Sequence, residues 1–130
     1  MGVTALDEIA GLEAAAIMHQ RVSSLPATVT VGELRTYFAE STSRQLAVLA
    51  DGDRYAGSIA ATAVPEAADA AEPAVRFAVR EPTVLPTAPA DEARDIALED
   101  PTHRLPVVGD DGRLLGIVAI DHTLTRFCGT

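Results

Sequence analysis

The sequence predicts a mixed α/β (α+β) fold made of two similar halves. In the stretch Arg104–His122, two apolar runs flank a short Gly/Asp turn, a pattern typical of a β-hairpin. A weaker copy of this pattern lies earlier, at Leu46–Ala60. The same offset, 59 positions, separates three pairs of residues: Leu46 and Leu105, Arg54 and Arg113, and Gly57 and Gly116. One constant offset indicates a duplication, and two copies of about 60 residues favour a pseudo-twofold pair over a solenoid, which needs three repeats.

The composition narrows the class of protein further. A chain of 130 residues is normally one globular domain, and its net charge of −9 opposes binding to nucleic acid or to anionic membranes. No apolar run approaches the ~20 residues of a membrane-spanning helix. The single cysteine, Cys128, cannot form an internal disulfide, so we expect a cytoplasmic protein. The three histidines lack the spacing of a zinc site, and we assign no metal.

Helical spacing of apolar residues predicts an amphipathic helix over residues 5–20, ahead of the first repeat. Its apolar positions are Leu6, Ile9, Leu12, Ala16 and Ile17. These side chains either pack in the core or face a second copy of the chain. The dimer interpretation rests on the segment having no counterpart in the repeat itself.

The two repeats predict the same order of elements. In the first, a capping box at Thr30–Glu33 starts a helix that runs to about Glu40 and leads into the first hairpin. In the second, Thr83–Pro86 matches Ser23–Pro26, and a helix over Ala90–Glu99 ends before Pro101. A helical turn at 72–77, a short helix near 65–71, and a last helix at 122–127 capped by Asp121 complete the expected elements. The predicted domains are an N-terminal helix at 1–20, a first repeat at 21–68 and a second at 69–130.

The order β-α-β-β-α, with Leu-Pro-Val-Val, an Asp/Gly turn and Leu-Leu-Gly-Ile-Val, resembles a CBS domain. Two such domains in tandem resemble the pair called a Bateman module, and the resemblance covers about residues 20–130. It implies two β-α-β-β-α repeats packed as a pseudo-twofold pair. It also implies adenosine-containing ligands, with AMP, ATP or S-adenosylmethionine as candidates and the identity left open.

The resemblance implies a ligand site beside the second repeat, at the strand ends. Family members that bind ligands carry a Ser/Thr and an Asp after the glycine of the last strand, where this chain has Ala119 and His122, with Asp121 one position early. Asp121 is therefore a helix cap or a ribose ligand, and Arg104 is a phosphate ligand or a solvated arginine. If Arg104 holds an anionic ligand, Arg104→Ala should abolish ligand binding without lowering the stability of the free protein by more than ~0.5 kcal/mol. The candidate ligand-binding residues are Thr83, Val84, His103, Arg104, Leu105, Pro106, Asp121 and His122.

Two classes of function remain. The first is a regulatory, ligand-sensing module that acts on a separate protein partner. The second is a structural dimerisation or interaction module whose ligand clefts are degenerate and empty. No Gly-rich phosphate loop, nucleophile elbow or close acid pair points to an enzyme, and we assign no catalytic residue. We expect a homodimer, with neither nucleic acid nor membrane as a partner.

Overall fold

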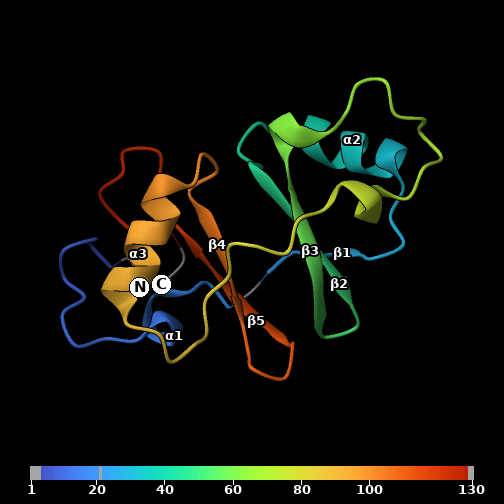
Figure 1. The fold of residues 1–130 in the computed structure, drawn as a ribbon. Helices are drawn as coiled ribbons and strands as arrows, with labels where there is room; N and C mark the ends of the chain where they lie inside the picture. Colours follow the sequence, from blue (N-terminus) through green and yellow to red (C-terminus); the bar gives the residue numbers. More distant parts are fainter. Residues whose placement is uncertain (1–3, 21, 129–130) are drawn as a thin grey trace. The chain divides into compact units, whose positions relative to one another are not determined.

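The computed structural model describes residues 4–20 and 22–128 (Figure 1). The outer limits of the predicted domains at residues 1, 21 and 130 therefore lie outside the described residues. The chain forms two compact units. One contains Ser23–Glu81 and is called the central unit below. The other joins Met1–Val22 to Pro82–Thr130 and is called the composite unit.

The central unit is built on a three-stranded sheet of order β1-β2-β3. Strand β1 (Leu25–Pro26) runs parallel to β2 (Leu46–Asp51), which pairs antiparallel with β3 (Arg54–Ala60). Helix α2 (Val31–Ala39) begins at the predicted capping box: the Thr30 hydroxyl accepts a hydrogen bond from the Glu33 backbone, and Thr30 N donates to Glu33 Oε1. The hydrogen bonds from Thr30 also lower the pKa of Glu33. Short 3₁₀ turns, η1 (Ala61–Ala63) and η2 (Ala74–Phe77), follow β3.

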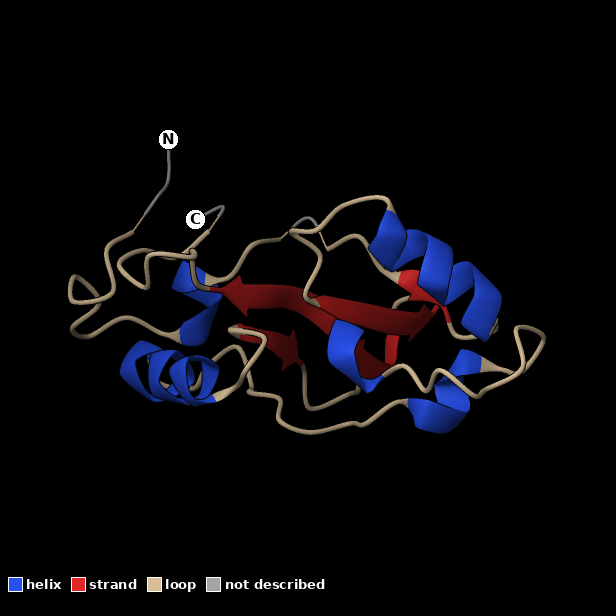
Figure 2. Ribbon diagram, turned by 90° about the horizontal axis from the view of Figure 1, so that it is seen from above, coloured by secondary structure: helices blue, strands red, loops and turns tan. Residues whose placement is uncertain are grey.

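The composite unit repeats this plan around a two-stranded sheet. Strands β4 (Arg104–Val108) and β5 (Leu114–Ala119) form the second predicted hairpin, and Val84 pairs parallel with Val107 as an isolated bridge. Helix α3 (Ala90–Glu99) has the predicted boundaries, and it contacts both strands and the short helix α1 (Ala14–Ile17). Figure 2 shows the helices lying against the strands rather than in their plane.

Each unit has its own aliphatic core. The larger cluster, in the composite unit, centres on a fully buried Phe127 beside Ile17, Leu105 and Ile120. The cluster in the central unit includes Val31, Leu34, Leu49 and Ile59. Small alanines of α3, such as Ala93 and Ala97, are completely buried, so the helix backbone can approach the sheet closely.

The pairing of the strands confirms that the glycines are equivalent but corrects the constant offset. The ladder of each hairpin has one irregularity, after Leu49 in β2 and after Val107 in β4. In both hairpins the residue just before the irregularity pairs with a glycine: Leu49 pairs with Gly57, and Val107 pairs with Gly116. Leu49 and Val107 are 58 positions apart, so Leu46 is equivalent to Arg104 and not to Leu105. The turn of the second hairpin holds the extra residue.

The segments ahead of the two repeats also correspond, which corrects the expectation that the N-terminal segment has no counterpart. Beside the two glycines, His19 pairs with Ile117 and Val79 pairs with Ser58. At the start of the same segments, Glu13 pairs with Pro89 and Pro73 pairs with Thr30. Residues 13–19 therefore occupy in the composite unit the place that residues 73–79 occupy in the central unit. Residues 13–19 lie ahead of both hairpins yet pack with the second one, and residues 73–79 lie between the hairpins yet pack with the first one.

This exchange changes the grouping that the sequence predicts for residues 1–20 and 69–81. Residues 69–81 begin the predicted second repeat, but Ala74, Phe77 and Ala78 pack in the core of the central unit. Conversely, Ile9, Ala14 and Ile17 from the N-terminal segment pack in the core of the composite unit. The backbone pairing with the sheets, rather than proximity in sequence, decides which unit each segment completes.

Two arginines hold the exchanged segments at equivalent points. On α2, Arg35 Nη2 donates to the carbonyls of Pro65, Glu66 and Ala68 at 3.0, 3.1 and 2.8 Å. On α3, Arg94 Nη1 donates to the Leu6 carbonyl at 3.2 Å. Arg35 and Arg94 are 59 positions apart, as are Leu6 and Pro65. The duplication therefore extends to side-chain contacts that fix the incoming segment.

The amphipathic helix predicted over residues 5–20 is wrong, since only Ala14–Ile17 is helical. Gly11 adopts a φ of +78°, which ends any helical path from residue 5, and the chain turns there before Leu12. The apolar residues that suggested a helix face include Ile9 and Ile17, and these are buried in the core. They therefore do not form a helical dimer stripe.

The helix predicted at 122–127 is also wrong. Residues 121–126 form turns in which Leu124 has a φ of +58°, and Phe127 pairs with Ile120 as a bridge. The carboxylate of Asp121 holds this turn by bonding to local backbone groups, a side-chain arrangement that competes with helix formation. The short helix expected near 65–71 is replaced by turns, whereas the helical turn at 72–77 is present as η2.

Within the described residues, no helix combines the length and the apolar character needed to cross a bilayer. Residues 4–20 and 22–128 likewise contain no cluster of three His, Cys, Asp or Glu side chains placed to hold a metal ion.

Candidate functional site

The predicted strand-end residues come together where β4 begins and β5 ends. Arg104 pairs with Ala119 in the ladder, and Ile120 N donates to the His103 carbonyl at 3.0 Å. His103, Arg104 and Asp121 therefore lie at one end of the hairpin, as the resemblance implies. We refer to this group, with His122, as the strand-end cluster.

The loop between α3 and β4 is held rigidly by its own side chains. Asp100 Oδ1 accepts hydrogen bonds from the backbone N–H and the hydroxyl of Thr102 at 2.9 and 2.7 Å. The same hydroxyl oxygen accepts from Arg104 N at 3.2 Å. His103, between them, adopts a φ of +51°, an uncommon conformation for a residue with a side chain. A ring nitrogen of His103 lies 3.2 Å from the Ala97 carbonyl near the end of α3.

Arg104 binds the protein backbone rather than pointing freely into solvent. Its Nη1 donates to the carbonyls of His103 at 3.1 Å and Ile120 at 3.0 Å, with a longer contact of 3.4 Å to Thr102. The guanidinium thus ties the start of β4 to the residue after β5. Arg104 is therefore not a freely solvated strand-end arginine, and these contacts predict a structural role for its side chain.

The carboxylate of Asp121 is likewise occupied by local donors. Its Oδ1 accepts from Thr125 N at 3.0 Å and Arg126 N at 3.2 Å, and its Oδ2 accepts from the Thr123 hydroxyl at 2.9 Å. The bond from Thr125, with smaller contributions from Thr123 and Arg126, lowers the pKa of Asp121. The sequence left Asp121 as either a helix cap or a ribose ligand. These hydrogen bonds are closer to a capping role, although the carboxylate caps a turn and not a helix.

The other predicted site residues are divided between the core and the surface. Leu105 is fully buried, and Val84 and Pro106 are also buried, so their side chains belong to the core. Thr83 is half-buried, immediately before the Val84 bridge, and His122 is exposed after β5. At this end of the hairpin the side chain of His122 is therefore accessible to a ligand, whereas the buried side chain of Leu105 is not.

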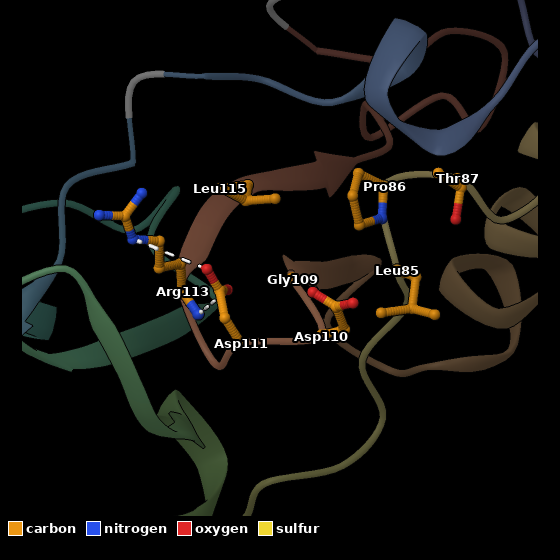
Figure 3. Close-up of a pocket in the computed structure, with 8 residues that line it drawn as sticks. All are labelled: Leu85, Pro86, Thr87, Gly109, Asp110, Asp111, Arg113 and Leu115. Carbon is orange, nitrogen blue, oxygen red and sulfur yellow. Dashed lines mark hydrogen bonds and ion pairs between the residues drawn. The ribbon is translucent and has the colours of Figure 1, made fainter.

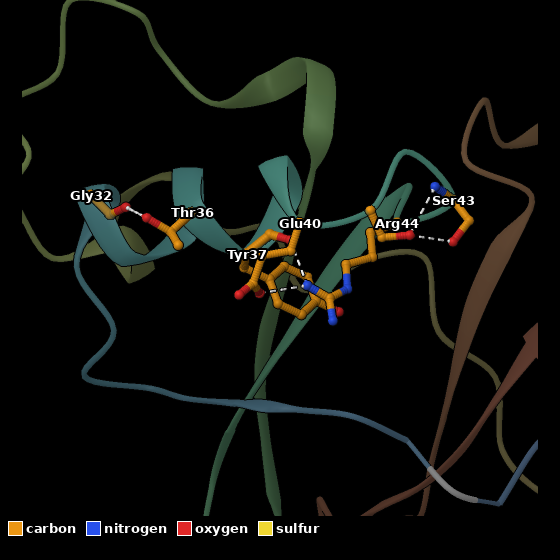
Figure 4. A network of polar contacts seen from close by, with 7 residues as sticks. Gly32, Thr36, Tyr37, Glu40, Ser43 and Arg44 are labelled. Carbon is orange, nitrogen blue, oxygen red and sulfur yellow. Dashed lines mark hydrogen bonds and ion pairs between the residues drawn. The ribbon is translucent and has the colours of Figure 1, made fainter.

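The corresponding end of the first repeat is closed by a different arginine. Arg44 Nη1 donates to the Tyr37 carbonyl at 2.7 Å and to Glu40 Oε1 at 3.0 Å. Its guanidinium also lies over the Tyr37 ring, 4.2 Å from the ring centre (Figure 4). These contacts to α2 hold the segment before β2, so the Arg44 guanidinium is already engaged by the protein.

A cavity of about 280 Å³ lies at the opposite end of the second hairpin, which sequence reasoning did not anticipate. Its walls come from the segment after Val84 and from the β4–β5 turn, as Figure 3 shows. The lining residues are Leu85, Pro86, Thr87, Gly109, Asp110, Asp111, Arg113 and Leu115. In the sequence, Leu85 and Leu115 look like ordinary apolar residues of two extended runs. Only the fold brings them together as exposed side chains that line one cavity.

Comparison with known proteins supports the resemblance. The family model of the CBS domain matches residues 75–127, and no curated protein sequence matches the chain. The fold is similar to the cystathionine β-synthase pair domain of a candidate Mg²⁺ transporter from Shewanella oneidensis, with 19% identity and a TM-score of 0.71. That match covers 82% of this chain and 64% of the other, so this chain spans less than two thirds of that relative's length.

Two further structures have the same fold. A CBS-pair protein from Arabidopsis thaliana is 17% identical over 82% of this chain and 87% of that chain, with a TM-score of 0.69. A CBS domain protein from Pyrobaculum aerophilum, solved in complex with AMP, is 26% identical over 83% of this chain and 87% of that chain, with a TM-score of 0.63. The CBS-domain model matches residues 75–127, and the two units together have the fold of CBS-pair proteins, which supports a tandem, Bateman-module arrangement.

Proposed function

We propose that this CBS pair is a regulatory module that senses an adenosine-containing nucleotide at the strand-end cluster of the composite unit. The observation that carries the proposal is the convergence of His103, Arg104, Asp121 and His122 at one end of the β4–β5 hairpin. Related folds from Pyrobaculum aerophilum and Arabidopsis thaliana have been solved with AMP, which supports this ligand class. AMP is therefore the first ligand to test, before ATP and S-adenosylmethionine.

The chemistry of the cluster suits an anionic ligand only weakly. Ala119 has no hydroxyl for a phosphate, and both oxygens of Asp121 already accept hydrogen bonds from residues 123–126. A ribose held without its own carboxylate forgoes a charge-assisted hydrogen bond worth roughly 1.5–3 kcal/mol. We therefore expect AMP to bind about tenfold to a hundredfold more weakly than at a site that keeps this carboxylate.

The same contacts favour a second candidate, an interaction module whose nucleotide site is degenerate. Arg104 and Asp121 are used to join β4, β5 and the following turn, as expected where a site has been converted to structure. A homodimer is part of both proposals. The exposed side chains of Val75 and Val79 would suit such a contact, and light scattering over a range of concentrations tests it.

The experiment restores the missing groups and measures AMP binding by calorimetry. The double variant Ala119→Ser/His122→Asp supplies a hydroxyl and a carboxylate at the two positions where ligand-binding relatives carry them. If the site is real, AMP affinity should rise about tenfold or more, since one added charge-assisted hydrogen bond is worth at least ~1.4 kcal/mol.

The matched control is Ala119→Ser/His122→Asn, which removes the same histidine but adds no charge, and it should bind AMP no better than the unchanged chain. Binding of AMP, ATP or S-adenosylmethionine to the unchanged chain would support sensing directly. If neither the unchanged chain nor the restored variant binds any of the three at millimolar concentration, the sensing proposal fails and the interaction module is favoured.

A further inference from the structure

The cavity at the turn end of the β4–β5 hairpin lies away from the strand-end cluster, and its lining combines apolar walls with negative charge. Leu85 and Leu115 leave 47% and 37% of their surface exposed, although large aliphatic side chains favour burial. Pro86 also lines the cavity, and Figure 3 shows Leu115 and Pro86 on one side and Leu85 beside Asp110 on the other. The groove can therefore receive an apolar side chain between these walls.

The charged residues at the rim of the groove determine which charge a bound molecule should carry next to its apolar side chain. Arg113 forms an ion pair with Asp111, at 3.8 Å between Nε and Oδ2, and its backbone N–H donates to Asp111 Oδ1 at 3.1 Å. That pairing offsets one of the two rim carboxylates and leaves the exposed Asp110 beside Leu85. The net charge of −9 adds a long-range field that attracts cations.

We propose that this groove docks a peptide segment of a partner protein in which a large apolar side chain stands next to a lysine or arginine. A cavity of about 280 Å³ is smaller than the usual range for drug-sized ligands, roughly 300–1,000 Å³. It fits one or two side chains. The apolar side chain displaces water from Leu85, Pro86 and Leu115, and the cation pairs with Asp110. The site is independent of the nucleotide proposal, because none of its lining residues belongs to the strand-end cluster.

The experiment titrates the full isotope-labelled chain with acetyl-Leu-Arg-amide, without nucleotide, and follows backbone amide shifts by NMR. The matched probe acetyl-Leu-Glu-amide has the same apolar residue with the opposite charge. We expect saturable shifts at residues 85–87 and 109–115 with the Arg probe, and at least a fivefold weaker response with the Glu probe. Raising the salt concentration should weaken binding, since the rim is exposed.

Two variants separate the parts of the site. Asp110→Asn should reduce the affinity for the Arg probe at least threefold, and Leu115→Ser should reduce the response to both probes. Asp7→Asn, which removes the same charge from an exposed position elsewhere in the composite unit, is the control and should leave the affinity within twofold. Equal binding of both probes, shifts confined to other residues, no shift at millimolar probe, or an unchanged Asp110→Asn would each overturn the proposal.

Discussion

Replacing Arg104 with alanine tests whether this residue has the structural role that its contacts indicate. The change removes hydrogen bonds from one charged nitrogen to the carbonyls of His103 and Ile120, at 3.1 and 3.0 Å. Hydrogen bonds that involve a charged group contribute about 1.5–3 kcal/mol each, and partial exposure of Arg104 reduces that value. We therefore expect Arg104→Ala to lower the free energy of unfolding by about 1.5–2 kcal/mol, three to four times the surface-residue expectation.

The assay is urea unfolding of the chain without ligand, with the midpoint and slope measured together. Arg76→Ala is the control, because Arg76 is 66% exposed and its ion pair with Glu72 is long, at 3.6 Å. That control should change stability by less than ~0.5 kcal/mol. If Arg104→Ala also costs less than ~0.5 kcal/mol, Arg104 does not join the strands, and it becomes available again as a ligand for phosphate.

Three further predictions concern the turn after β5, the exchanged segment and the α2 clamp. The lowered pKa of Asp121 contributes stability above the ordinary carboxyl pKa of about 3.9, and that contribution is lost as pH falls through the folded value; Asp121→Asn should remove this dependence in unfolding midpoints followed into acid, and an identical profile in both proteins would contradict it. Gly116→Ala places a Cβ 2.6 Å from Met18 Sδ and 2.8 Å from the His19 carbonyl, so urea unfolding should show a loss of ~1–3 kcal/mol, and a loss below ~0.5 kcal/mol would show that the segment yields easily. Arg35→Ala frees three carbonyls at 65–68, and hydrogen exchange at 68–72 should accelerate about tenfold for a loss of ~1.4 kcal/mol, whereas unchanged exchange would deny the clamp its role.

Local patterns in the sequence predicted those elements whose stability is itself local. The hairpins follow from apolar runs around turn residues, and the capping box at Thr30–Glu33 specifies the start of α2 with contacts over three positions. The helix Ala90–Glu99 ends where Pro101 forbids its continuation. Each of these interactions joins residues only a few positions apart, so the element can be predicted without knowing the tertiary fold.

The helix predicted at 122–127 failed for a local reason, the turn held by Asp121, whereas other features were missed because they depend on distant partners. The segment 5–20 has apolar residues at helical spacing, but Gly11 turns the chain and Ile9 packs into a core supplied largely by residues beyond 82. The role of Arg104 depends on the Ile120 carbonyl, which reaches it only when the hairpin forms. The groove at the turn end needs Leu85 and Leu115 together, and their separation in sequence conceals it.

The exchange of segments 13–19 and 73–79 has a consequence for biosynthesis. During translation the central unit has all of its parts once residue 81 has emerged, because η2 and Val79 immediately follow the hairpin that they complete. The composite unit needs residues 4–20 together with the β4–β5 hairpin, so the earlier segment waits for its partner until residues 104–119 have been synthesised. Until then Ile9 and Ile17, which are buried in the folded protein, remain exposed on the nascent chain. The core of the composite unit is complete only after Phe127 has been synthesised.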